Sequence, residues 1–339
     1  MSTINDVARL ADVSTMTVSR VVNRSDYVSA ATRARVERAI VELGYVPNAL
    51  ARQFRSKRTK TIALVMADIT NPFFTTVARG VEDVAGPRGF GVLFCNTDES
   101  ETREVEYVSM LVQRQVAGVL LVPASSSSRS LAILGAQQVP VVIVDRRVRS
   151  HRVDVVRGDS LAGAHALGQH LIQLGHRRIA ILAGRKTVST SVDRVTGFTR
   201  ALAAAGITQD PRLVRYGGYH QSEGYAMALE VLEERPAPTA IFAANNFIAV
   251  GAMRAIREAG LHAPDDLSIV GFDDLPPDWS MDPFLTVVAQ PAYTFGQRAA
   301  ELLLERIDGQ APDNAREFVL PGELIVRRSS GPPRAEIAA

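Results

Sequence analysis

The pattern of apolar and polar positions divides the 339-residue chain into two parts. Up to about residue 45, apolar residues recur at helical spacing only, and no alternation typical of a strand is found. From residue 61 onward, short β-branched apolar runs alternate with amphipathic stretches. The sequence therefore predicts a small all-α head followed by a larger α/β core.

Three helices are predicted in the head, ending at residue 10, spanning about 15–23, and spanning about 30–43. Thr3 or Asn5 can cap the first helix, Ser29 can cap the third, and Gly44 ends it. A further short segment at 48–56 can also be helical, and a polar, basic linker follows it up to residue 60.

The core alternates candidate strands with candidate helices. The strands are predicted at 61–67, 90–95, 117–122, 140–144, 178–182, 212–216, 239–243 and 267–271. The amphipathic stretches lie at about 73–86, 101–115, 161–174, 193–205, 222–234, 247–259 and 294–307. Continuous apolar strands separated by helices are typical of parallel sheets covered on both faces. Two doubly wound halves account best for this pattern, and a closed eightfold βα barrel is the alternative.

Polar side chains follow the ends of several predicted strands: Asp68, Asn96, Asp145, Asp159, Asn245 and Asp273, with Arg146 and Arg194 nearby. In open α/β sheets the ligand crevice lies beyond the carboxyl ends of the strands. A polyhydroxylated ligand suits this set, because a hydroxyl can donate to a carboxylate and accept from a guanidinium or an amide. At any single position, capping of the following helix is the alternative.

Residues 4–23 fit two short helices joined by a tight turn, with Ser14 as the cap of the second. The apolar positions that can pack the pair together are Ile4, Val7, Ala8, Val18, Val21 and Val22. Such a pair presents its second helix to the major groove of DNA. Thr15, Met16 and Arg20 then lie on the open face, where Arg20 can reach a guanine edge.

The head, unlike the rest of the chain, carries an excess of positive charge. Residues 1–60 carry eleven Lys and Arg against five Asp and Glu, a net charge of +6. The whole chain carries +2, so the remainder carries −4. A basic head on a mildly acidic body suggests a polyanionic partner for the head, with a solvated basic face as the alternative.

The composition indicates the cellular compartment in which the protein is found. Hydrophobic residues make up 46% of the chain, yet apolar runs such as 116–122 fall far short of the ~20 residues of a membrane span. No secretory signal is visible at the N-terminus, and Cys95 is the only cysteine. We therefore expect a cytoplasmic protein with no membrane association and no internal disulfide.

The ordered motifs together resemble those of the LacI/GalR family of bacterial transcriptional regulators. They comprise 6–23, 28–33, 43–48, Asp68 to Phe74, Gly175 to Ala180, Arg194 to Phe198, Val270 to Asp274 and 285–288. The resemblance covers essentially residues 3–330. It implies a helix-turn-helix head on a periplasmic-binding-protein-like core of two doubly wound parallel-sheet subdomains. It also implies a homodimer on a pseudo-palindromic operator.

The resemblance further implies a domain organisation. The helix-turn-helix domain is expected at 1–47, the hinge helix and linker at 48–60, and the effector-binding and dimerisation core at 61–339. One subdomain would comprise about 61–158 and 292–320, and the other about 159–290 and 321–330. Three crossovers near 158–160, 289–292 and 320–322 would join them.

DNA contacts are expected from the second helix and from the hinge, which the family places in the minor groove. The expected residues are Thr15, Met16, Thr17, Ser19, Arg20, Asn23, Asn48, Ala51, Arg52, Phe54 and Arg55. Phe54 stands where the family typically has a leucine that wedges between base pairs. Phenylalanine is itself a known wedge residue, although its wider, flatter ring puts the kink in doubt, and packing on the dimer mate is the alternative.

The effector-binding residues implied by the resemblance are Phe73, Phe74, Asp145, Arg194, Tyr219, Asn245 and Asp273. Aromatic rings here can stack on the apolar face of a pyranose, so a carbohydrate is expected. Lys186 and Arg185 hint weakly at a sugar acid or a sugar phosphate, and a nucleobase is a further alternative. Trp279 can flank the pocket or belong to a lid or core, and Asn246 replaces the family's usual aspartate.

Enzyme classes are disfavoured. Gly184 to Thr187 is similar to the tail of a phosphate loop, but the earlier glycine is missing. The six histidines lack metal-ligand spacing, and His176 is expected to make a structural hydrogen bond. We expect no catalytic residue, cofactor or metal, and a sugar-processing enzyme is the remote alternative. Effector binding between the subdomains would change operator affinity, most simply as a repressor. The C-terminal segment 327–339 has no leucine heptad, so a dimer rather than a tetramer is expected.

Overall fold

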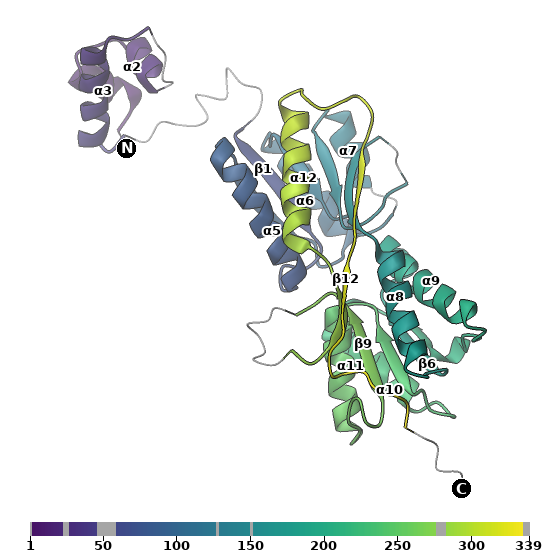
Figure 1. Ribbon diagram of the computed structural model, residues 1–339. Coiled ribbons are helices and arrows are strands. Elements are labelled where there is room, and N and C mark those ends of the chain that lie inside the picture. Colours follow the sequence, from purple (N-terminus) through teal and green to yellow (C-terminus); the bar gives the residue numbers. More distant parts are fainter. Residues whose placement is uncertain are drawn as a thin grey trace. The chain divides into compact units, whose positions relative to one another are not determined.

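The computed structural model describes residues 2–22, 27–45, 59–126, 129–149, 152–275 and 283–334. The chain contains two compact units, residues 1–59 and residues 60–339 (Figure 1). The first unit is the all-α head and the second is the α/β core, as the sequence predicts.

The described part of the head contains α1 (Ile4–Leu10), α2 (Thr15–Val22) and α3 (Ala30–Glu42). Thr3 caps α1 in a capping box with Asp6, which decides between the two predicted caps. Ser14 Oγ accepts from the Thr17 amide at 3.1 Å, and Ser29 caps α3. The first helix ends at the predicted residue, and the second and third begin at the predicted residues.

The head's core comprises Val7, Ala8, Ala11, Val18, Val21, Val36 and Ala39, with Ile4 and Val22 partly buried against it. All six apolar positions predicted to join the first two helices therefore pack there. Asp12 adopts a left-handed backbone (φ 49°) in the turn between α1 and α2, a conformation that Asp tolerates better than most residues. The turn brings α2 across α1 as a helix-turn-helix requires.

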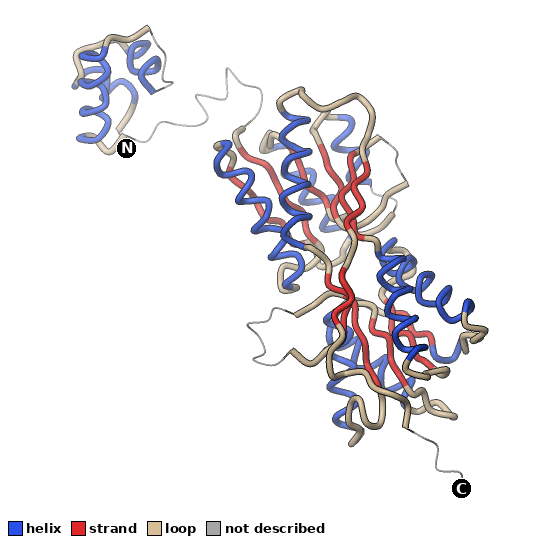
Figure 2. Tube along the Cα trace, viewed as in Figure 1, coloured by secondary structure: helices blue, strands red, loops and turns tan. Residues whose placement is uncertain are grey.

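The core contains two six-stranded sheets (Figure 2). The first has the order β11-β5-β4-β3-β1-β2, and all its neighbours are parallel. Its strands are β1 (Thr61–Met66), β2 (Gly91–Asn96), β3 (Gly118–Leu121), β4 (Val141–Val144), β5 (Asp154–Gly158) and β11 (Glu317–Leu320). Helices α5 (Pro72–Ala85), α6 (Glu101–Gln113), α7 (Arg129–Ala136) and α12 (Ala292–Ile307) belong to this N-subdomain, and the 3₁₀ turn η1 (Gly86–Arg88) follows α5.

The second sheet has the order β12-β10-β9-β8-β6-β7, and only β12 is antiparallel to its neighbour. Its strands are β6 (Ile179–Ala183), β7 (Val214–Tyr216), β8 (Ala240–Ala243), β9 (Ser268–Phe272), β10 (Thr286–Ala289) and β12 (Glu323–Ile325). Helices α8 (Ser160–Gln173), α9 (Ser189–Ala204), α10 (Gln221–Leu232) and α11 (Asn246–Glu258) complete this C-subdomain, with η2 (Pro211–Leu213) before β7.

Helices on both faces explain why the strands are continuously apolar. Ile62, Leu64 and Met66 of β1 pack toward α5 and α12, whereas Ala63 and Val65 pack toward α6 and α7. In the C-subdomain, α10 and α11 cover one face and α8 and α9 cover the other. Each strand therefore buries both of its faces, so its sequence shows no alternation with polar residues.

The chain crosses between the sheets three times, and the crossover segments run together between the subdomains (Figure 1). β5 leads into α8, β10 leads into α12, and β11 leads into β12. The two open sheets exclude the closed barrel that the sequence had left as an alternative.

The sequence did not predict strands β10, β11 and β12 or helix α7, and for β5 it predicted only a short strand before Asp159, without bounds. β11 and β12 were missed because they are edge strands of four and three residues that each begin with an exposed glutamate. Helix α7 was missed because it is short, and the bounds of β5 were obscured because it is short and the polar Arg157 interrupts its apolar run.

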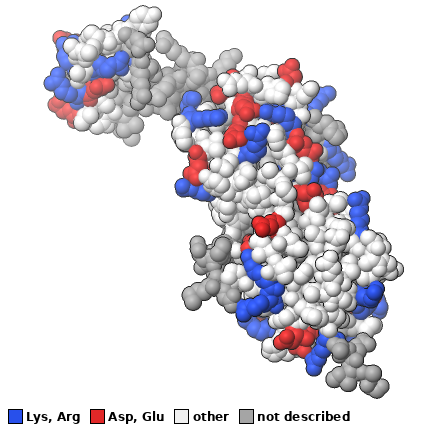
Figure 3. Space-filling model, viewed as in Figure 1, with Lys and Arg blue, Asp and Glu red and all other residues white. Residues whose placement is uncertain are grey.

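Charge is mixed on the core. Acidic and basic side chains are interspersed over the face of the core that Figure 3 shows, rather than gathered in one patch. Among the described residues, no helix is long and apolar enough to cross a bilayer.

Candidate DNA interface and ligand pocket

The second helix of the head carries the predicted base-reading residues on its open face. Thr15, Met16 and Arg20 are exposed, and 56% of Met16 is accessible to solvent. Thr17 and Ser19 are partly buried, with the Thr17 hydroxyl 2.9 Å from Ser14 Oγ. Val18 and Val21 occupy the opposite face and pack into the head's core. The helix can thus enter a groove while its apolar face stays buried.

Several predicted contacts lie outside the described residues: Asn23, Asn48, Ala51, Arg52, Phe54 and Arg55. Trp279 also lies outside them. Their expected roles at the DNA and at the pocket stay predictions.

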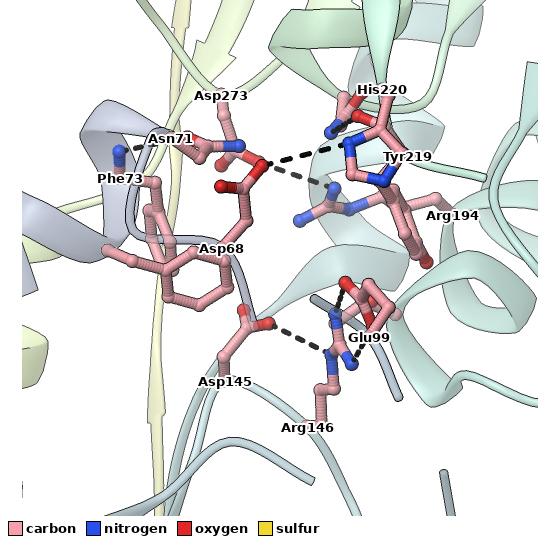
Figure 4. A pocket seen from close by; sticks show the side chains of 13 residues that line it. Asp68, Asn71, Phe73, Glu99, Asp145, Arg146, Arg194, Tyr219, His220 and Asp273 are labelled. Carbon is pink, nitrogen blue, oxygen red and sulfur yellow. Dashed lines mark hydrogen bonds and ion pairs between the residues drawn. The ribbon is translucent and has the colours of Figure 1, made fainter. Parts of the chain in front are cut away.

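The core holds a pocket between the subdomains, beyond the carboxyl ends of both sheets (Figure 4). It encloses about 450 Å³ free of protein atoms, part of which is open to solvent. Its lining comprises Asp68, Asn71, Phe73, Phe74, Glu99, Asp145, Arg146, Thr190, Arg194, Tyr219, His220, Asn245 and Asp273. All seven residues expected to bind an effector lie in this set.

Asp145 and Asp273 enter the pocket from equivalent places in the two subdomains. Each follows the third strand from its sheet's β11 or β12 edge and has a left-handed backbone, with φ of 68° and 67°. Each amide donates to the neighbouring strand, to Val156 O at 2.8 Å and to Val288 O at 2.9 Å. This shared turn ends strand pairing and directs both carboxylates into the cleft.

Glu99 and Arg146 form a buried, bidentate ion pair at one end of the pocket. Arg146 Nη1 and Nη2 donate to the two carboxylate oxygens at 2.7 and 2.5 Å, and Nη1 also donates to Pro123 O. Although burial alone lowers it, the pKa of Arg146 is held above its usual value by Glu99. The pair neutralises itself and leaves the Nε of Arg146, which is 3.6 Å from Asp145, without a hydrogen bond.

Arg194 lies at the opposite side of the cleft, on α9. Its guanidinium stacks on Phe272 at 3.8 Å and donates to Ala244 O at 2.7 Å. Asp273 lies 3.4 Å from the same Nη1 and also accepts from Gln290 at 2.6 Å. These contacts fix the guanidinium plane facing the pocket, where it can donate to a ligand.

Aromatic rings line two sides of the pocket. Asn71 caps α5 by accepting from the Phe73 amide at 3.0 Å, and this places Phe73 and Phe74 in the first turn. Their rings meet edge to face with centroids 5.1 Å apart. Tyr219 enters from the C-subdomain and packs against Gly184, where any Cβ would lie 2.1 Å from the phenol ring. Burial raises the pKa of the Tyr219 phenol, so it is a neutral donor at physiological pH.

Carboxylates outnumber guanidiniums in the pocket. Asp68, Glu99, Asp145 and Asp273 face only Arg146 and Arg194, with His220 3.9 Å from Asp68. Burial raises the pKa of Asp145 to about 6, although Arg146 and Arg194 oppose this. The surplus of acceptors favours a ligand rich in hydrogen-bond donors and disfavours an anion.

Some polar residues singled out in the sequence have other roles. Asp159 caps α8, and Asn96 accepts from the Ile69 amide and donates to Asp98, so neither lines the pocket. Lys186 lies over the Tyr216 ring, and Arg185 donates to Glu99 O, so the hint of an acidic ligand loses its basis. His176 is buried among Thr239, Ser268 and Gly331, as expected for a structural histidine.

Other pocket residues were not among those expected to bind an effector. Nothing in the sequence pattern indicated that Asn71 and Glu99 line a pocket. Asp68 and Arg146 were indicated only by their position at the ends of predicted strands. Thr190 and His220 begin or precede helices after strands of the C-subdomain, and this position at the carboxyl edge was the only available signal.

A helix-turn-helix head joined to a two-subdomain core with a polar pocket between the subdomains defines a DNA-binding regulator that responds to a ligand. Comparisons with known proteins agree. Residues 3–48 match the model of bacterial regulatory proteins of the lacI family, and residues 169–330 match the periplasmic binding protein-like domain.

Relatives cover nearly the whole chain. The HTH-type transcriptional repressor PurR of Aliivibrio salmonicida (strain LFI1238) is 34% identical over 97% of this chain and 99% of its own length. A solved complex of the transcriptional regulator CelR with cellobiose is 36% identical, with a TM-score of 0.74 over 97% of this chain and all of the other. The solved structure of the lac repressor dimer bound to operator and the anti-inducer ONPF is 29% identical, with a TM-score of 0.84 over 97% of this chain and 99% of the other.

The chain belongs to the lacI family of bacterial regulatory proteins. It is a transcriptional regulator and not an enzyme.

Proposed function

We propose that this regulator represses transcription as a homodimer on a pseudo-palindromic operator and that a neutral, sugar-like effector controls its operator affinity. The observation that carries this proposal is the pocket between the subdomains, because both contribute side chains to it. A ligand there contacts both halves at once and so favours one relative angle between them. The protein would act in the cytoplasm, where its DNA is.

The charge balance and the relatives support the effector class. Two surplus carboxylates would repel a sugar acid or a sugar phosphate, whereas sugar hydroxyls can donate to them. The CelR structure contains cellobiose, and a LacI family regulator from Enterococcus faecium contains ribose. A nucleobase is the second candidate, because Phe73, Phe74 and Tyr219 offer aromatic faces and the polar residues offer both donors and acceptors.

The same contacts suggest how effector binding would change the affinity for DNA. Effector binding would change the angle between the subdomains and hence the spacing of the two hinge segments at 48–55 of the dimer. Hinge order and operator affinity would change with that spacing. Couplings of this kind are typically about 1–3 kcal/mol.

A thermal-shift screen of the full chain tests the pocket. The panel comprises neutral sugars, sugar acids, sugar phosphates and nucleobases. A ligand at about 100 times its Kd stabilises the folded protein by about 2.7 kcal/mol. We expect a neutral sugar to raise the Tm of the wild-type protein.

Variants of two pocket residues and a matched control locate the effect. Arg194→Ala and Asp273→Ala should abolish the shift. Arg254→Ala removes an exposed guanidinium of the same subdomain that pairs with Glu258 and Tyr225 and does not line the pocket, so it should retain the shift. A panel without any hit, or a hit unaffected by both pocket variants, would contradict the proposed effector site.

A further inference from the structure

Two buried asparagines join the subdomains at the pocket, independently of any charged group. Asn71 Nδ2 of the N-subdomain donates to Asn246 Oδ1 at 3.0 Å, and Asn246 Nδ2 donates back to Asn71 Oδ1 at 3.1 Å. Exposure is 6% for Asn71 and 0% for Asn246. Each residue thus supplies one donor and one acceptor across the cleft.

Backbone amides fix the orientation of both side chains. Asn71 Oδ1 also accepts from the Phe73 amide at 3.0 Å, and Asn246 Oδ1 accepts from the Phe247 amide at 2.8 Å. An amide flipped by 180° would place its NH₂ group against a backbone N–H. The two amides are therefore held in the one orientation in which they bond each other reciprocally.

The other polar contacts across the cleft differ in kind. The Arg147 amide donates to Ser189 Oγ at 2.8 Å, and the Arg147 guanidinium forms an ion pair with Asp193 of α9. Arg185 donates to Glu99 O at 3.0 Å, and His220 lies 3.9 Å from Asp68. Each involves a partly exposed or a charged side chain. Asn246 is fully buried, Asn71 is nearly so, and both side chains are neutral, so water competes least with this pair.

We propose that Asn71 and Asn246 form a latch that holds the two subdomains closed against each other. Opening the cleft separates four buried polar atoms that bond each other only in the closed state. A carboxylate at residue 246 would accept from Asn71 Nδ2 but would leave Asn71 Oδ1 facing an oxygen with no proton to share. The latch therefore depends on the amide at residue 246.

Isosteric substitutions test the latch without disturbing the helix starts. Asn246→Asp and Asn71→Asp each remove one cross-cleft donor, and the carboxylate introduced at residue 71 can still accept from the Phe73 amide. Asn96→Asp is the matched control, because Asn96 Nδ2 donates to Asp98 at 2.7 Å within one subdomain.

The readout is the distance between two spin labels in the full chain, without effector and without DNA. Labels at Gln113 of α6 and at Glu233 after α10 lie on exposed positions of the two subdomains. The buried Cys95 is replaced by alanine beforehand, and circular dichroism verifies that each variant is folded. We expect one dominant distance in the parent protein and in Asn96→Asp. In each latch variant a second distance should appear, with roughly a tenfold lower ratio of closed to open molecules.

Lowering the pH provides a second test of the latch. Protonating the carboxylate introduced by Asn246→Asp restores a donor toward Asn71, so the closed distance should return as the pH falls. The same charged and titratable groups line the pocket in every variant, so the parent protein at the same pH is the reference; they are Asp68, Glu99, Asp145, Arg146, Arg194, Tyr219, His220 and Asp273.

Each outcome decides the proposal. Opening in both latch variants, reversed by acid in Asn246→Asp and absent in the control, supports it. Unchanged distances in either latch variant, opening of Asn246→Asp that acid does not reverse, or opening in all three variants would overturn it. Because neither effector nor operator is present, this result is separate from that of the ligand screen.

Discussion

At the scale of single residues, the pocket depends on side chains whose backbones are held in uncommon conformations. Asp145 and Asp273 have φ near 68° at equivalent strand ends, and Asp98 and Glu99 follow one another with φ of 50° and 58°. These turns aim carboxylates into a site where guanidiniums cannot neutralise all of them. The effect of this excess negative charge on stability should be measurable at Asp145.

Asp145→Asn should change the pH dependence of stability. Burial raises the pKa of Asp145 to about 6 in the folded protein, from 3.8. The folded protein therefore binds the proton more readily than the unfolded chain, so this carboxyl destabilises it increasingly as the pH rises from about 4 to about 6 and by a constant amount above that. Asparagine is isosteric, uncharged and tolerant of positive φ.

The variant should therefore be more stable than the parent protein at about pH 7.5, by about 1–3 kcal/mol, and the gap should close toward pH 4. Thermal unfolding at a series of pH values measures this difference. A gap that stays constant over the series would show that Asp145 does not titrate in this way.

Residues at strand ends were also those that the sequence could predict. Asp145, Asn245 and Asp273 follow apolar runs, and the carboxyl ends of parallel strands share one edge, so their convergence follows from the fold class. Glu99 lies in a loop whose two left-handed residues leave no sequence signal. Asn71 was hidden for another reason, because its partner Asn246 is 175 positions away and the pairing exists only when the subdomains meet.

At the scale of secondary-structure elements, close helix contacts build the subdomains. α5 and α12 cross at Gly80 and Gly296, and each glycine lies against the backbone of the other helix. A Cβ at Gly296 would be 2.0 Å from Val77 O, and one at Gly80 would be 2.2 Å from Tyr293 O. Since α12 enters the N-subdomain directly after a crossover, this contact also anchors the connection between the subdomains.

Gly296→Ala should destabilise the core, because backbone atoms cannot move aside as a flexible side chain can. We expect a loss of about 1–3 kcal/mol in the free energy of unfolding, measured in urea. Gly135→Ala on α7 is the control, since no atom lies within 4 Å of its added Cβ, and it should be neutral or slightly stabilising. Equal effects of the two substitutions would refute the helix-contact argument.

Strands that bury both faces could be predicted reliably from the sequence, and edge strands could not. Strands such as β1 and β8 are continuous apolar runs and were recognised within one or two residues. The edge strands β11 and β12 bury little apolar surface and contain exposed residues, so their sequence pattern resembles that of a loop.

At the scale of the whole molecule, the proposed dimer needs an apolar surface for the second copy. β2 is an edge strand of its sheet, yet Leu93 and Phe94 on it are 37% and 40% exposed. Ile69, which is 45% exposed, bonds through its amide to Asn96 at the end of the same strand. Three large apolar side chains at one sheet edge are typical of a surface that another chain covers.

Phe94→Lys should therefore convert the dimer to a monomer. Sedimentation velocity of the full chain would show the smaller species, with retained circular dichroism as evidence of folding. Val319→Lys on β11, at the opposite edge of the same sheet, is a control with the same exposure of 40% and should leave the dimer intact. A Phe94→Lys protein that remains dimeric would exclude this edge as the interface.

The central claim is that one chain reads DNA and reports a small molecule, and operator binding with and without effector tests it most directly. The operator is first selected from random duplexes with the full chain, and its affinity is then measured by fluorescence anisotropy with and without the sugar found in the screen. We predict a pseudo-palindromic sequence whose affinity changes at least about fivefold with the sugar. Arg20→Ala should lose about 1–3 kcal/mol at one base pair in each half-site. Binding that shows no sequence preference, or that the sugar leaves unchanged, would contradict the account.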